Sequence, residues 1–316
     1  MVRAITLFWL LSLLSVGVAP GLADGMMVRP LTKREWARNR ERAMINEPNQ
    51  KAVVFFEKGR QQLIISPSFD GAPAEFAWII PVPSRPNVQI LDGAIFHELA
   101  RLTSPPPPRQ GNGFKGAAGS APTASVQVLE RKTVGAYDVS VLAATDGRAL
   151  SRWLNQNGYR VPERAQKPIS EYVREKWTFV ACKVKNTGSA SGLRSGTLAP
   201  IRLTFNTKRP VYPMRISSTN PGYFHVLVYL ILPRTESGGE RNGRRLTVSA
   251  PGNPAYINIR WAAEFLPHNR RPHPTVAKLS RAHLDIFVLQ SSFQPQDSTR
   301  DYVWQTRGSM SAAAIR

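Results

Sequence analysis

The sequence contains a single cysteine, Cys182, among its 316 residues. A disulfide within the chain is therefore excluded, even in an oxidising compartment. Cys182 stands in the alternating segment 177–184, where it shares one face of a predicted strand with Val180 and Val184. A nucleophilic cysteine needs a lowered pKa and a histidine partner, and the sequence shows neither. We predict that Cys182 packs in the core as a small hydrophobic residue.

Acidic residues are scarce as well, because 21 Asp and Glu stand against 42 Lys and Arg, which gives a formal net charge of +21. Such an excess of cations attracts a protein to anionic surfaces such as phospholipid, cell-wall polymer or nucleic acid. Net charge also keeps an Arg-rich protein soluble without any binding role. The cations are spread over most of the chain, which favours the second interpretation and leaves the first open.

Motifs for catalysis and metal binding are missing too. The sequence has no G-x-S-x-G nucleophile motif and no Walker-type loop. His268, His273 and His283 lie in a Pro- and Arg-rich segment, but their spacing fits neither a helical pair nor a zinc finger. We therefore predict no catalytic residues, no cofactor and no metal. Nucleic acid is not an expected partner, because no basic motif interleaved with aromatic residues is present.

The first 23 residues have the pattern of a signal peptide. Arg3 supplies the positive charge, the segment 4–18 is apolar, and Gly21 and Ala23 place small residues where a signal peptidase cuts. The apolar run is too short for a comfortable membrane span, so no transmembrane helix is expected after cleavage. We predict an exported protein, periplasmic or extracellular, whose mature chain begins near Asp24. An uncleaved anchor is the alternative.

The most informative part of the chain is the stretch 76–86. Its unbroken apolar run at 76–80 predicts a strand that is buried on both faces. Prolines then follow, and because proline cannot donate to a sheet we expect them to stop the strand and form a stiff elbow. This elbow would hold two polar side chains at a fixed place on the surface. The candidate residues for binding or structure are Trp78, Pro81, Pro83, Ser84 and Arg85.

Signals before this stretch predict a helix and a hairpin. Thr32 and Glu35 have capping-box spacing, and the helix that they begin would be strongly basic and would run to Ile45. Two apolar runs within 51–66 flank a glycine-bearing turn, which predicts a β-hairpin. We expect this hairpin to form one sheet with the strand at 76–80.

Helices are also predicted after the elbow. Asp92 can cap a helix whose apolar residues recur at helical spacing, and His97 and Glu98 fall outside that stripe, so both should face solvent. Asp146 can cap a second helix, and Pro168 stands in the first turn of a third.

The fold class that follows is α+β, with mainly antiparallel β-sheets, three or four short helices, and two lobes joined by a Pro- and Gly-rich linker. The predicted segments are the signal peptide 1–23, a basic lead-in segment 24–48, a first β lobe with a helix 49–103, the linker 104–124, a second α+β lobe 125–233, an exposed loop 234–253 and a C-terminal extension 254–316.

Several blocks of the sequence together resemble one bacterial family of exported proteins, known as domain of unknown function twenty-three thirty. They are QKAV at 50–53, GR at 59–60, EFAWIIPVP at 75–83, YDV at 137–139, WLNQNGY at 153–159 and PVYPMRI at 210–216. The resemblance covers roughly 48–232 and brings no established catalytic residues. Many members carry cysteines just after the signal peptide. This chain has Asp24, Gly25, Met26 and Met27 there, so a metal or disulfide role of those cysteines does not carry over.

The interpretation that these observations favour is an exported, non-catalytic α+β protein that binds a protein partner or an anionic surface of the cell envelope. The alternative is a cryptic secreted hydrolase with an unrecognised active site, which would use Ser84 or one of the histidines. The sequence names neither the ligand nor the oligomeric state.

Overall fold

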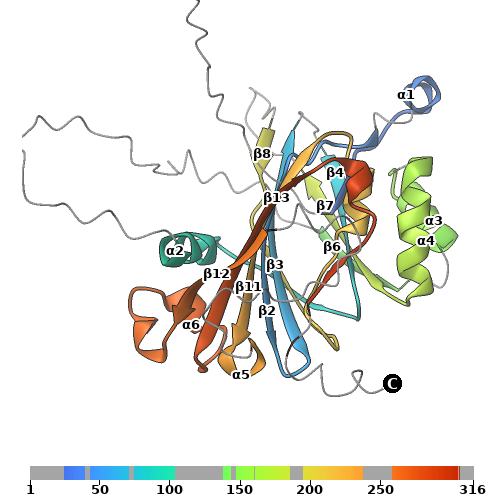
Figure 1. Ribbon diagram of the computed structural model, residues 1–316. Helices are drawn as coiled ribbons and strands as arrows, with labels where there is room; N and C mark the ends of the chain where they lie inside the picture. Colours follow the sequence, from blue (N-terminus) through green and yellow to red (C-terminus); the bar gives the residue numbers. More distant parts are fainter. Residues whose placement is uncertain are drawn as a thin grey trace, which may run out of the picture.

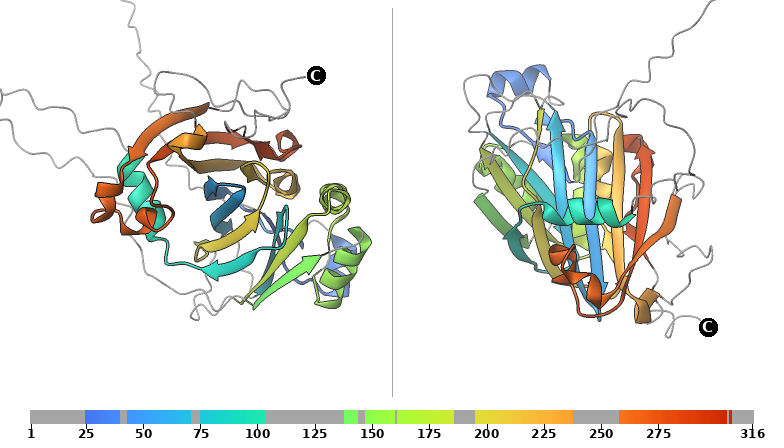
Figure 2. Two further views of the ribbon diagram at one scale, coloured as in Figure 1. Left: turned by 90° about the horizontal axis from the view of Figure 1, so that it is seen from below. Right: turned by 90° about the vertical axis from the view of Figure 1, so that its left-hand side faces the viewer.

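Two β-sheets pack face to face in the computed structural model, and helices cover the outer face of each sheet (Figure 1). The structure describes residues 25–39, 43–70, 75–103, 138–143, 147–159, 161–185, 195–237, 258–304 and 306. In Figure 1 and in the left view of Figure 2, α3 and α4 lie on the opposite side of the sheets from α2 and α6. The order of layers is therefore helix, small sheet, large sheet, helix.

The large sheet has the strand order β12-β13-β11-β2-β3-β9-β5, and β8 pairs with the end of β3. Its neighbouring strands are antiparallel except β2 and β11, which are parallel. Lys58 and Gly59 both have positive φ in the tight β2–β3 turn, which confirms the predicted hairpin. The strands are β2 (Asn49–Glu57), β3 (Arg60–Asp70), β5 (Asn87–Ile90), β8 (Ser195–Thr197), β9 (Ile201–Asn206), β11 (Phe224–Pro233), β12 (Asn258–Phe265) and β13 (Leu284–Phe293).

The small sheet is antiparallel and has the order β1-β4-β7-β6. Its strands are β1 (Met26–Val28), β4 (Glu75–Val82), β6 (Asp138–Ala143) and β7 (Thr178–Lys185), and a separate pair is formed by β10 (Val211–Tyr212) and β14 (Tyr302–Val303). The strand predicted at 76–80 is thus present as β4, but it does not join the sheet of the β2–β3 hairpin. The reason is that β2 and β3 pair on their other sides with β11 and β9.

Within the described residues, four helices of six to ten residues lie at the four predicted places, and two single-turn helices add to them. The helices are α1 (Lys33–Arg38), α2 (Ala94–Thr103), α3 (Gly147–Gln156), α4 (Gln166–Arg174), α5 (Arg234–Ser237) and α6 (Pro274–Ala277), with 3₁₀ turns at Glu163–Ala165, Arg215–Thr219, Pro267–Arg270 and Pro295–Asp297. No helix in the described ranges is long and apolar enough to cross a membrane.

The first of these helices, α1, begins as predicted and ends earlier than predicted. The Thr32 hydroxyl accepts a hydrogen bond from the Glu35 amide, and the Glu35 carboxylate accepts one from the Thr32 amide, so the capping box is present. The helix stops at Arg38 and not at Ile45, because the following apolar residues are drawn into the core. Met44 bridges to Val28, and the Ile45 amide donates to the carbonyl oxygen of Met27.

Three hydrophobic cores separate the layers, and β4 contributes to two of them. Phe76, Trp78 and Ile80 belong to the core between the two sheets, whereas Ala77 and Ile79 pack on the other face with α3 and α4. A strand with two buried faces must be apolar at successive positions, so the predicted burial of this run is confirmed. The third core lies between the large sheet and the helices α2 and α6.

Cys182 lies in the core between the sheets, as predicted, and is fully buried. Burial raises the pKa of its thiol to about 12, because the charged thiolate is disfavoured away from water. The thiol is therefore protonated near neutral pH and is not a nucleophile.

Glu98 corrects a sequence prediction, because it is buried and does not face solvent. Its carboxylate accepts hydrogen bonds from the amide groups of Thr275 (3.0 Å) and Val276 (2.8 Å), at the start of α6. These partners lie 177 and 178 residues further along the chain. The helical spacing around Glu98 covers only its own helix, so it could not reveal them. His97 is exposed, as predicted.

The α+β class with mainly antiparallel sheets is confirmed, whereas the division into two lobes is not. Strands from both predicted lobes pair with one another in both sheets: β2 with β11, β3 with β9, and β4 with β7. The predicted C-terminal extension also supplies β12, β13 and β14. The backbone N–H and C=O groups of a buried strand must form hydrogen bonds, and here strands from the two predicted lobes form them with one another. The predicted linker at 104–124 lies outside the described residues, as does the predicted loop from 238 onward.

Candidate functional site

The predicted elbow is a structural connection that leads into the edge of the large sheet. Trp78 is fully buried, and Pro81 lies inside β4, opposite Phe179, so the strand continues to Val82. Proline is tolerated here because β1 pairs only with the earlier residues of β4, Ala77–Ile79, and Pro81 lies beyond them. The predicted stop is therefore wrong for Pro81, and the strand ends directly before the second proline, Pro83.

The Ser84 side chain of the elbow faces the far end of β9. The Ser84 hydroxyl donates a hydrogen bond to the carbonyl oxygen of Asn206 at 2.8 Å, and this bond fixes the start of β5 beside β9. Pro83 is half-buried and Arg85 is exposed. A binding role for Ser84 and Arg85 stays a prediction, and none of the elbow residues lines the pocket described next.

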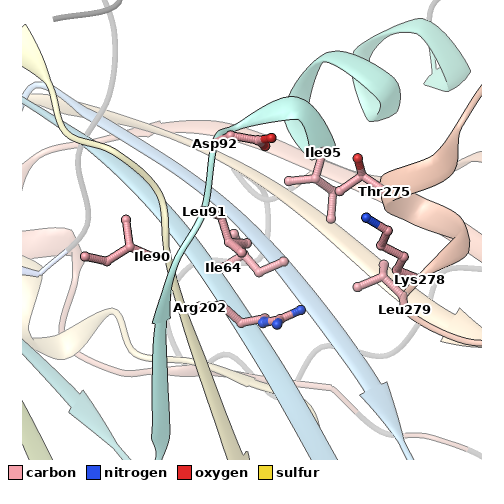
Figure 3. A pocket seen from close by; sticks show the side chains of 9 residues that line it. All are labelled: Ile64, Ile90, Leu91, Asp92, Ile95, Arg202, Thr275, Lys278 and Leu279. Atoms are coloured by element: carbon pink, nitrogen blue, oxygen red, sulfur yellow. The ribbon is translucent and has the colours of Figure 1, made fainter. Parts of the chain in front are cut away.

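A pocket of about 340 Å³ lies at the other end of β5, between the large sheet, α2 and α6 (Figure 3). It is lined by Ile64, Ile90, Leu91, Asp92, Ile95, Arg202, Thr275, Lys278 and Leu279. The turn from β5 into α2 shapes one wall. There the Asp92 carboxylate accepts a hydrogen bond from the Ala94 amide at 3.0 Å, and Gly93 has φ +82°, a value that favours glycine.

Arg202 brings a positive charge to this pocket from β9. One of its terminal nitrogens donates to the side-chain oxygen of Gln62 at 3.4 Å, and the other donates to the side-chain oxygen of Gln89. Its Nε is buried and has no hydrogen-bond partner among the described residues. The two glutamines lie on the strands on either side of β9, so they orient the guanidinium group without neutralising its charge.

Exposed cations continue from the pocket over the neighbouring helices. We call the following set the basic face: Arg101 on α2, Arg270 and Arg271 at the 3₁₀ turn, Lys278 after α6, and Arg281. The Arg101 guanidinium donates to the carbonyl oxygen of Pro272 at 2.8 Å, which holds the turn against α2. Glu98 lies in the same region, and its buried carboxylate accepts hydrogen bonds from the amide groups of Thr275 and Val276.

A serine and a histidine also meet on the outer face of the large sheet. The Ser292 hydroxyl lies 2.5 Å from Nδ1 of His225, across the pair of β11 and β13. A hydrolytic triad needs a third group that orients the imidazole, and in the described ranges no carboxylate hydrogen bond reaches His225. The pair is therefore a cross-strand contact, and it gives the hydrolase interpretation no support.

The three C-terminal histidines do not form a metal site in the part of the chain that the structure describes. His268 is exposed, and Nε2 of His283 lies 3.5 Å from the Glu264 carboxylate. The pKa of His273 is lowered, first by burial and then by the charge of Arg101. A neighbouring cation of this kind also opposes the binding of a metal ion.

Sequence reasoning missed the pocket and missed Arg202. The lining residues come from four separate parts of the chain, and Arg202 alternates with apolar residues on β9 as any outward-facing strand residue would. The available signal was the Asp92 cap, which marks where α2 begins. That signal gives no information about the strand or the helix opposite.

Comparison with known proteins gives a family and little else. A family model described as an uncharacterized protein conserved in bacteria (DUF2330) matches residues 37–255. No curated protein matches the chain. Among solved structures, the crystal structure of baculovirus P35 aligns with 9% sequence identity, 83% of this chain and 92% of that chain being covered, at a TM-score of 0.35. That score is too low to support any argument.

Proposed function

We propose that this chain, which belongs to the DUF2330 family of uncharacterized bacterial proteins, is an exported, non-catalytic protein that binds an anionic surface of the cell envelope. The observation that supports this proposal is the basic face. Five exposed cations lie on α2, at and just after the 3₁₀ turn, and in the residues that follow α6. Together they concentrate in one region a part of the charge that the sequence spreads along the chain.

Clustered cations bind an anionic surface because each one gains attraction within about a Debye length of it. A lipid or polymer surface offers many negative charges at once, so no single deep pocket is required. The periplasm or the exterior would supply such surfaces, in agreement with the signal-peptide pattern of residues 1–23. N-terminal sequencing of protein isolated from the bacterium tests export: a mature end near Asp24 supports it, and an intact Met1 in cytoplasmic protein contradicts it.

Replacing Arg270, Arg271 and Arg281 with glutamine is expected to weaken binding to vesicles of phosphatidylglycerol and phosphatidylcholine by at least about tenfold. Each cation near such a surface contributes about 1 kcal/mol, and the neighbouring cations retain part of the attraction. The measurement is co-sedimentation of the purified protein with the vesicles at low and at high salt. Binding of the unchanged protein should fall at high salt, because ions screen the attraction.

The matched control removes the same number of charges from α1, by Lys33→Gln, Arg34→Gln and Arg38→Gln. These residues are exposed, and α1 lies apart from α2 and α6 (Figure 1). The control is expected to bind nearly as well as the unchanged protein. Equal weakening by both triple variants would show that diffuse charge is responsible. Absence of binding at low salt, or capture of an acidic protein in place of vesicles, would also contradict the proposal.

A further inference from the structure

We infer that the pocket between the large sheet, α2 and α6 binds a small monoanionic carboxylate that carries a short branched aliphatic group. The carboxylate would lie between Arg202 and Lys278. This inference concerns a small molecule and rests mainly on Arg202, which is not part of the basic face; only Lys278 belongs to both sets, so the inference does not depend on the proposed function. The cations of the pocket support the anionic group, the net charge of the lining supports a single negative charge, and the apolar walls support the aliphatic group.

The anionic part of the ligand follows from Arg202. The guanidinium is held in place by two neutral glutamine oxygens, and no ion pair to it is present among the described residues. Its Nε remains a buried donor without a partner. A guanidinium presents its donors in a planar fork that matches a carboxylate, and a partly buried position strengthens the attraction.

A second cation approaches the same space from the opposite wall. Figure 3 shows the guanidinium of Arg202 extending from the sheet and the ammonium group of Lys278 extending from the end of α6 toward the pocket. Lys278 is exposed, so its side chain can move to meet a ligand. The hydroxyl of Thr275 also lines this wall and can act as a donor.

The ligand is assigned a single negative charge because the carboxylate of Asp92 also lines the pocket. Two cations and one carboxylate leave a balance of one positive charge. A ligand with one negative charge neutralises this balance, whereas a phosphate monoester carries roughly 1.5 to 2 charges near neutral pH and would be repelled by Asp92.

The aliphatic group of the ligand is inferred from the apolar residues that form the remaining walls of the pocket. Ile64, Ile95 and Leu279 are buried side chains that form the apolar lining, and Ile90 at the pocket is 50% exposed. A half-exposed isoleucine beside a pocket gains free energy when a ligand's aliphatic group covers it. The volume of about 340 Å³ lies near the lower end of small-molecule sites, which range from about 300 to 1,000 Å³, so the ligand should be small.

The test uses 4-methylpentanoate as the probe and 4-methylpentanamide as its uncharged equivalent, with binding measured by calorimetry and by amide chemical shifts. The purified protein should bind the carboxylate at millimolar concentration and bind the amide at least about tenfold more weakly. Arg202→Gln should weaken carboxylate binding by about tenfold or more, because a charge-assisted hydrogen bond is lost. Lys278→Met should weaken it less, because Lys278 is exposed.

The control variant Lys33→Met, on α1, should leave carboxylate binding unchanged, and a thermal melt should show that Arg202→Gln remains folded. Equal binding of the carboxylate and the amide, unchanged binding by Arg202→Gln, or no binding of either probe would overturn the inference. Tighter binding of isobutyl phosphate than of the carboxylate would overturn the single-charge assignment. Because Arg202 is outside the basic face, loss of carboxylate binding with vesicle binding retained, or the reverse, separates this inference from the proposed function.

Discussion

Replacing Arg215 with glutamine is expected to lower the free energy of unfolding by about 3–5 kcal/mol, because it leaves a buried carboxylate without its counter-charge. The carboxylate is that of Asp301, whose side chain is 6% exposed and lies 2.7 Å from the guanidinium. The Arg215 Nε donates to it at 2.8 Å, and the Arg215 amide donates to its other oxygen at 3.0 Å. An Asp301 carboxylate without Arg215 would have too little contact with water to replace the lost ion pair.

The same guanidinium joins three parts of the chain that are distant in sequence. Its two terminal nitrogens donate to the two carboxylate oxygens of Glu175, at 2.5 and 2.6 Å, and its Cζ lies 4.2 Å from the centre of the Tyr172 ring. The Tyr172 hydroxyl donates to Asp301 at 2.5 Å, and burial raises its pKa, so that it stays protonated and remains a donor. Arg215 thus ties the end of α4 to the segment before β14.

Urea denaturation followed by tryptophan fluorescence gives the measurement, and Arg174→Gln is the control. Arg174 is exposed in the last turn of α4, so its loss should change the free energy of unfolding by less than about 0.5 kcal/mol. The double variant Arg215→Met with Asp301→Leu should recover part of the stability, because it removes both charges. Similar effects of Arg174→Gln and Arg215→Gln would show that the network contributes no more than a surface charge.

Replacing Trp78 with alanine is expected to cost about 3–5 kcal/mol, the range for large-to-small changes of aromatic residues in a core. Trp78 is fully buried in the core between the sheets. Gly25 lies directly against it: a Cβ at Gly25 would stand 2.2 Å from the indole Nε1, and the φ of Gly25 is +111°. Glycine and indole therefore fill this space together, and removing the indole leaves a cavity that β1 and β4 cannot close without moving.

The measurement is again the free energy of unfolding in urea, and Trp36→Ala on α1 is the matched control. Trp36 is only half-buried, and α1 contributes no fully buried residue, so the same chemical change there should cost less than half as much. An equal cost at both positions would mean that Trp78 is not a major part of the core. Far-ultraviolet circular dichroism distinguishes a destabilised fold from one that does not form.

Local features of the fold could be predicted because their causes lie within a few residues. The capping box at Thr32 and the cap at Asp92 are present as expected. Gly158 follows the end of α3 with φ +86°, a value that favours glycine, and Tyr159 is buried directly after it. In each case the dihedral angles or hydrogen bonds of neighbouring residues decide the outcome.

The candidate functional residues, by contrast, could not be predicted from their neighbours in the sequence. Ser84 and Arg85 were selected because a proline-rich elbow would hold them rigidly, yet Ser84 donates to the backbone of β9 and Arg85 lies apart from the pocket. Arg202 gave no signal in its own segment, because what distinguishes it is the pair of glutamines on neighbouring strands and the helix opposite.

The α+β class, the starts of the four main helices, the burial of Cys182 and the burial of both faces of 76–80 could all be predicted from the amino-acid sequence. These follow from the period of apolar residues and from caps, which act over short distances. Three features became visible only in the folded chain: β4 lies outside the hairpin's sheet, Glu98 faces α6, and Arg202 and Lys278 line one pocket. Each of these depends on which distant segments pair or pack together, and that choice is made by the whole core rather than by any one stretch of residues.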